Sequence, residues 1–216
     1  LYIASQQGHL DIVRLLLEAV AAINQASARG ATPLYMACQN GYVEIVRLLL
    51  EAGAAVNQAT EDGATPLLIA CQNGHIDIAR LLLEASAAIS QADEDGATPL
   101  YIACQEGRLE IIRLLLEAGA SASQARNDGV TPLLIACESG HVECARLLLE
   151  SGAAKDQAKQ NGATPLYMAC QNGHLEIARL LLEASAAVGQ ASNNGNGATP
   201  LGHHVHVHVV GILMGR

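Results

Sequence analysis

A block of 33 residues recurs along this chain, and the repetition constrains the possible folds more strongly than any other feature of the sequence. The blocks open at Gly30, Gly63, Gly96, Gly129 and Gly162. The string GATPLYMACQNG, residues 30–41, returns unchanged at residues 162–173 and in edited form elsewhere. A fixed period of this length is typical of solenoids, in which each unit contacts only the units before and after it.

The period predicts a single repeat domain over residues 1–201. Its parts are a partial unit at residues 1–29 and full units at residues 30–62, 63–95, 96–128, 129–161 and 162–196. Residues 202–216 are a divergent tail or a degraded last repeat. Because the sequence begins within a unit, we expect it to be a fragment of a longer protein.

Each unit contains the signals for two short helices. Thr32 and Pro33 predict the start of the first helix, since a threonine hydroxyl accepts from early backbone N–H groups and proline fits the first helical position. Gly41 predicts its end, because glycine readily adopts the left-handed conformation. Apolar residues cover most of the second helix, expected at residues 43–52, which indicates burial on two sides. A polar turn then leads to the next unit.

These elements predict an all-α solenoid of stacked helix-turn-helix units with projecting β-turn loops. Isolated helices shorter than about 12–15 residues are marginal in water, so neighbouring units must stabilise each helix pair. The sequence contains no Phe or Trp, and its core must therefore consist of Leu, Ile, Val and Ala. The formal net charge of −9 disfavours binding to nucleic acid or to anionic membranes.

The string GATPLYMACQNGYVEIVRLLLEAGAAVNQA resembles the ankyrin repeat, whose pattern includes T-P-L-H-x-A, a following Gly and a second helix rich in Leu. The resemblance extends over residues 1–201. The His of the family pattern is replaced in this chain by Tyr2, Tyr35, Leu68, Tyr101, Leu134 and Tyr167. The hydrogen bond that the family forms between its Thr and that His therefore cannot form here.

The resemblance implies two antiparallel helices per unit and a loop at right angles to them, which together form a concave surface that binds other proteins. It also implies a non-catalytic protein inside the cell, in the cytoplasm or the nucleus. On this resemblance, the partner-binding candidates are the loop tips and the exposed ends of the first helices. They are Glu61, Asp62, Ala64, Gln72, Asn73, Glu94, Asp95, Ala97, Gln105, Glu106, Asn127, Asp128, Val130, Glu138 and Ser139.

Most of these candidates are polar or acidic, which predicts a protein partner with a Lys or Arg patch and binding that weakens as salt rises. The alternative interpretation is that the acids only keep the loops solvated. A protein-interaction scaffold is the leading hypothesis for the function. A regulatory arm of a larger enzyme, channel or signalling protein, docked on its own chain, is the alternative.

Two residue types recur at the repeat period outside this surface. On the second helices, acidic residues surround Arg14, Arg47, Arg80, Arg113, Arg146 and Arg179. This arrangement predicts a solvated, salt-bridged outer face. The first helices carry Cys38, Cys71, Cys104, Cys137 and Cys170, and Cys144 replaces an Ile of the second helix. We expect reduced core thiols, and unpaired thiols favour a reducing compartment.

The tail GHHVHVHVV, residues 202–210, is the one candidate for metal binding. In an extended strand His204, His206 and His208 share a face and could bind zinc, copper or nickel, with His203 nearby. A degraded repeat is the alternative interpretation. The histidines that follow the first helices, such as His75, are expected to be structural. No nucleophile, base and orienting group converge, so we expect no enzyme activity, no cofactor and no small-molecule substrate.

One region of the stack is expected to pack less well than the rest. Val56 and Ile89 follow the second helices of two units, where the next two units have Ala122 and Lys155. A lysine is unfavourable in an apolar core and should extend outward. We therefore expect local opening to begin within residues 119–160.

Overall fold

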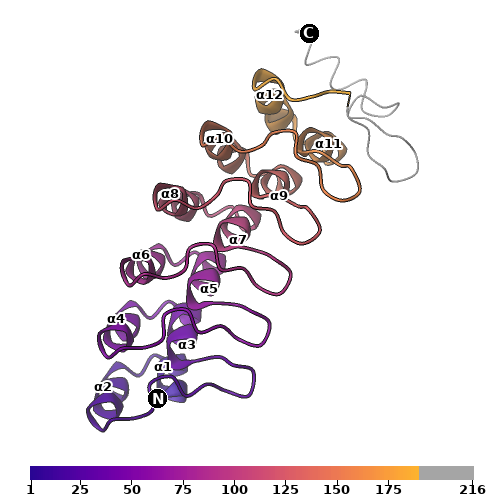
Figure 1. Ribbon diagram of the computed structural model, residues 1–216. Coiled ribbons are helices and arrows are strands. Elements are labelled where there is room, and N and C mark those ends of the chain that lie inside the picture. Colours follow the sequence, from indigo (N-terminus) through magenta and orange to yellow (C-terminus); the bar gives the residue numbers. More distant parts are fainter. Residues whose placement is uncertain (190–216) are drawn as a thin grey trace.

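The computed structural model describes residues 1–189, in which twelve helices stack as six successive pairs. Figure 1 shows an elongated, curved stack with two rows of helices, and loops that project from the side of the first-helix row. The described residues contain no β-strand. The predicted all-α solenoid with projecting loops is confirmed, whereas the predicted domain end near residue 201 and the tail lie outside the described residues.

The first helix of each pair begins at a threonine and a proline in all five full units. These helices are α1 (Tyr2–Gln7), α3 (Pro33–Asn40), α5 (Pro66–Asn73), α7 (Pro99–Gln105), α9 (Pro132–Ser139) and α11 (Pro165–Gln171). In α3, Thr32 Oγ1 accepts the backbone N–H of Tyr35 at 3.1 Å. Gly41 ends the same helix in the left-handed conformation, with φ of 79°. The predicted start and stop signals are thus confirmed.

The second helices form the other row, on the side of the stack away from the loops (Figure 1). They are α2 (Leu10–Glu18), α4 (Val43–Glu51), α6 (Ile76–Glu84), α8 (Leu109–Glu117), α10 (Val142–Glu150) and α12 (Leu175–Glu183). Exposed Arg–Glu pairs on α4, α10 and α12 join atoms 3.2–3.7 Å apart. The predicted salt-bridged outer face is confirmed on these three helices, where such exposed pairs contribute little stability.

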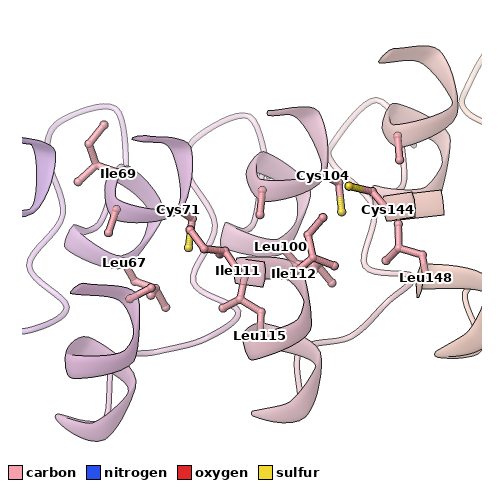
Figure 2. Packing of buried hydrophobic residues seen from close by; sticks show 14 of the residues in the cluster. Leu67, Ile69, Cys71, Leu100, Cys104, Ile111, Ile112, Leu115, Cys144 and Leu148 are labelled. Atoms are coloured by element: carbon pink, nitrogen blue, oxygen red, sulfur yellow. The ribbon is translucent and has the colours of Figure 1, made fainter. Parts of the chain in front are cut away.

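The core runs continuously between neighbouring pairs instead of dividing into separate units. Figure 2 shows Leu100, Ile111, Ile112 and Leu115 among the packed side chains, and all four are fully or almost fully buried. Because every pair covers the apolar side of the next, helices of nine residues or fewer persist where isolated ones would not.

The cysteines lie within this core. Cys38, Cys71, Cys104, Cys137 and Cys144 are buried, Cys170 is half-buried, and all six are free thiols. The prediction of reduced core thiols is confirmed for five of them. Burial raises the pKa of each of these thiols, and it raises the pKa of Cys170 to about 11.

Neighbouring units are also joined by hydrogen bonds at the ends of the first helices. His75 Nε2 lies 3.2 Å from the carbonyl oxygen of Gln39, so this nitrogen donates to a helix carbonyl of the preceding unit. The imidazole lies over Gly41, where a Cβ atom would approach the ring to 2.7 Å. His141 and His174 donate in the same way, at 3.0 and 3.1 Å. The structural role predicted for these histidines is confirmed.

A second set of hydrogen bonds between units joins the turns that follow the second helices. The side chains of Asn24 and Asn57 accept from the backbone N–H groups of Ala55 and Ala88, each at 2.8 Å. Ser123 accepts from Ala154 at 2.9 Å in the corresponding place. Within residues 1–189, the equivalent bond between Ser90 and the Ser121 N–H is missing.

A hollow lies beside Ala122, and Lys155 does not border it. This hollow of about 320 Å³ lies between α8 and α10, bordered by Ala122, Leu116 and Leu147. Val56, Ile89 and Lys155 are all only half-buried, so this position does not require an apolar side chain. Ala122 and Ser121, whose N–H lacks the bond to Ser90, are neighbours in the turn after α8. Local opening within residues 119–160 stays a prediction.

The reactivity of the thiols tests their burial. We expect an alkylating reagent to modify Cys170 first in the folded protein, because the other five are reached only when the stack opens. Since only the thiolate reacts, the Cys170 rate should rise about tenfold per pH unit up to its pKa. Peptide mass spectrometry measures each site, and unfolded protein, in which all six should react alike, is the control. Equal rates at all six sites in the folded protein would contradict the buried core.

The missing bond at Ser121 gives a second test. We expect the Ser121 amide to exchange with deuterium faster than the equivalent amides of Ala55, Ala88 and Ala154, which are hydrogen-bonded. The substitution Ser90→Asn should supply the bond, slow exchange at Ser121 and stabilise the protein by about 1 kcal/mol. Ser90→Ala is the matched control and should change neither quantity. Unaltered exchange at Ser121 in the Asn variant would show that the bond does not form.

Candidate functional site

The concave face of the stack is formed by the loops together with the first-helix row (Figure 1). At each loop tip a β-turn is closed by a backbone bond, such as Gly63 N–H to the Thr60 carbonyl at 3.0 Å. Adjacent tips are joined as well, because Glu61 N–H donates to the Arg29 carbonyl at 3.0 Å and Glu94 N–H to that of Asp62 at 3.1 Å. The loops are therefore held side by side as a ladder.

The structure places several predicted contact residues on the surface of this ladder. The side chains of Glu61, Asp62, Glu94, Asp95 and Asn127 are exposed at three successive tips. Asp128 belongs to the third tip and is half-buried. These side chains come from three units but lie along one edge of the molecule.

Three predicted contact residues lie underneath the loops instead. Ala64, Ala97 and Val130 are 8 %, 3 % and 4 % exposed. Ala97 and Val130 pack in a cluster with Tyr101 and Leu134. Their side chains fix each loop against the first helices and offer almost no surface to a partner.

The predicted residues at the helix ends form the inner part of the concave face. Gln72, Asn73 and Ser139 are exposed, while Gln105, Glu106 and Glu138 are half-buried. Asn73 Nδ2 donates to the Gln39 carbonyl at 3.1 Å, and the Glu138 carbonyl accepts from Asn172 and His174. Asn73 thus already stabilises a junction between units, and the Glu106 carboxylate accepts from Gln105 Nε2 at 3.2 Å.

The electrostatics of the loops differ between units. Arg126 Nε donates to Asp128 Oδ1 at 3.1 Å, a second guanidinium nitrogen donates to Oδ2, and the Val130 N–H donates to Oδ1 at 3.1 Å. The bond from Arg126, helped by that from Val130, lowers the pKa of Asp128. Asp128 is thereby neutralised by its own loop, and Glu61, Asp62, Glu94 and Asp95 are the exposed loop-tip acids that form no salt bridge within residues 1–189.

Sequence reasoning overlooked three residues of this face. Arg126 lies over the ring of Tyr101, with its Cζ atom 5.5 Å from the ring centre. Tyr35 lines a hollow of about 420 Å³ between the first two loops and helices α1 and α3. The sequence did contain a signal, because Tyr returns at the same place in T-P-L-Y of the units at 30–62 and 96–128. We interpreted that Tyr only as a replacement for the His of the family pattern.

The described part of the chain holds no group of three or more His, Cys, Asp or Glu side chains placed to bind a metal ion. The metal candidates His204, His206 and His208, with His203, lie outside that part. None of the helices in residues 1–189 is long and apolar enough to cross a membrane.

Comparisons with known proteins agree with this architecture. A family model described as ankyrin repeats in three copies matches residues 1–93, 54–125, 89–160, 120–192 and 151–213. The crystal structure of the human ASB11 ankyrin repeat domain is 30 % identical in sequence, with a TM-score of 0.86 over 97 % of this chain and 95 % of that chain. A search of curated proteins gives no significant match. The repeats, the stacked helix pairs and the matches over nearly the whole length show that this chain belongs to the ankyrin repeat family.

Proposed function

We propose that this protein is a non-catalytic scaffold that binds a partner protein through its concave surface, and that the partner presents lysine or arginine side chains. The observation that carries the proposal is the pair of adjacent acidic tips, Glu61–Asp62 and Glu94–Asp95. All four residues are exposed, and none of their carboxylates forms a salt bridge within residues 1–189. Arg126 is near enough to Asp95 to interact with its charge at longer range.

The loop ladder supports this proposal by holding the carboxylates in place before a partner arrives. Backbone bonds of 3.0–3.1 Å fix the spacing between neighbouring tips, so little main-chain entropy is lost on binding. The Arg126–Asp128 pair lies on one side of the acidic tips and Arg29 on the other. A basic segment centred on the two acidic tips fits this order of charges, whereas an acidic segment is repelled there.

The thiols support a location inside the cell, in the cytoplasm or the nucleus. Six unpaired cysteines, five of them buried, are compatible with a reducing compartment.

Removal of the acidic charges tests the binding surface. In the double variant Glu94→Gln/Asp95→Asn, we expect a Lys-rich peptide to bind about tenfold more weakly, because two carboxylates near the peptide charges are lost. Affinity for the unchanged protein should also fall as salt rises from low to physiological concentration. Isothermal titration calorimetry measures both effects.

The matched control is Glu51→Gln/Glu84→Gln, which removes the same charge from exposed positions on α4 and α6. It should leave the affinity near that of the unchanged protein. Affinity capture from cell extract with the three proteins extends the test, since a true partner is lost only with the concave variant. Equal losses in the two double variants would mean that net charge alone attracts the peptide, and would contradict the proposed site.

A further inference from the structure

In the unit at residues 96–128, the guanidinium group of Arg126 is held by two other side chains of the same unit. Arg126 lies over the Tyr101 ring at 5.5 Å and donates two hydrogen bonds to Asp128. Tyr101 is only 2 % exposed. A tyrosine face and a carboxylate thus enclose a flat cation from two directions, an arrangement that combines cation–π attraction with a charge-assisted bond.

The unit at residues 30–62 repeats this arrangement without the arginine. Tyr35 and Asp62 occupy the places of Tyr101 and Asp128, while Thr60 stands where Arg126 is found. Tyr35 is only half-buried and Asp62 is exposed. The Asp62 charge is close enough to contribute to the raised pKa of Tyr35, after the larger effect of burial.

A hollow occupies the corresponding space. Its volume is about 420 Å³, within the range of about 300–1,000 Å³ that is typical of ligand pockets. Tyr2, Tyr35, Met36, Gln39, Thr60 and Asp62 contribute to its lining. The apolar and aromatic atoms suit the stem and plane of an arginine, and the carboxylate suits its charged end.

We infer that this hollow receives an arginine side chain of the partner protein, which lies against Tyr35 and pairs with Asp62. The inference rests on the proposed function and gives the partner's key residue. Thr60 Oγ1 donates to Asp62 Oδ1, just as the Val130 N–H donates to Asp128 Oδ1. Asp128 accepts the Val130 bond and still accepts two bonds from the Arg126 guanidinium. By analogy, Asp62 can accept the Thr60 bond together with two bonds from a guanidinium.

Arginine fits this hollow better than lysine. A guanidinium is planar, stacks on an aromatic ring and bonds a carboxylate with two N–H groups, whereas an ammonium is a strongly hydrated point charge. Arg29 also lines the hollow and repels a cation, but Glu61 and Asp62 line it too and leave an excess of one negative charge. Substitution of Arg29 by Ser should therefore strengthen binding.

Other units do not offer this combination within the described residues. Leu68 and Leu134 replace the tyrosine in the units at 63–95 and 129–161. In the partial unit, Arg29 stands where Asp62 is found. Among the units whose loops are described, at residues 1–161, the hollow beside Tyr35 is therefore the place where both groups face an open space.

The test uses the capped peptide Gly-Ser-Arg-Ser-Gly and two analogues that contain lysine or the uncharged citrulline. We expect the arginine peptide to shift the NMR signals of residues 27–36 and 60–62, with about tenfold weaker binding of the citrulline peptide. Asp62→Asn should weaken the arginine peptide by a similar factor. Thr60→Arg should abolish binding, because the chain then fills its own hollow as Arg126 does.

The reverse substitution, Arg126→Thr, is the matched control. It should open an equivalent hollow beside Tyr101 and add a second set of shifts around residues 126–130. Undiminished binding to the Thr60→Arg protein, with its spectrum showing a folded chain, would overturn the inference. A second outcome separates the two proposals. If lysine and arginine peptides bind equally, and Glu94→Gln/Asp95→Asn weakens both while Thr60→Arg weakens neither, the hollow is not an arginine site. The proposed acidic binding surface would still stand in that case.

Discussion

The contact between one helix pair and the next is the interaction on which the whole structure depends. Helices of nine residues or fewer are too short to persist alone, and their end carbonyls need donors. The neighbouring unit supplies both requirements, as His75 does when it lies over Gly41 and donates to the Gln39 carbonyl. Ile45 is buried between two pairs, whereas the equivalent Ile12 of the first described pair is exposed. Burial of the same residue type therefore depends on the neighbour, not on the unit itself.

This dependence separates the residues that maintain the stack from those that are free to carry function. The threonine caps, the core leucines and the loop-base alanines meet the same surroundings in every unit and hardly vary along the chain. The loop tips project beyond the contact, and their backbone ladder uses only main-chain atoms. Side chains at the tips change from Glu to Asn or Gln along the chain while the ladder stays intact. Such a surface suits recognition of a partner, because charge and shape are set one unit at a time.

The helix starts, the helix ends and the core positions of each unit were predictable from the sequence, whereas the positions of the loop side chains were not. The 33-residue period predicted the helix pairs, the Thr-Pro starts and the buried cysteines, because each of these follows from local signals copied in every unit. The loop tips and helix ends were expected to form a polar and acidic surface. The burial of Ala64 beneath its loop and the Arg126–Asp128 pair were missed, because both depend on how a loop folds back on its own helix. Likewise, the half-buried state of Val56 and Ile89, which occupy the position of Lys155, follows from the shape of the turn, which hydrophobicity alone does not define.

The comparison between Thr60 and Arg126 shows how a regular stack acquires an irregular surface. The two residues occupy the same backbone position two units apart, next to the same Tyr and Asp types. In one unit the chain itself covers a tyrosine and a carboxylate with Arg126, whereas in the other the same two groups border an open hollow. Because each unit contacts only its neighbours, such an exchange alters the surface without disturbing distant packing. In a solenoid the repeated positions hold the fold, and the exceptions to the repeat are the first places to look for specificity.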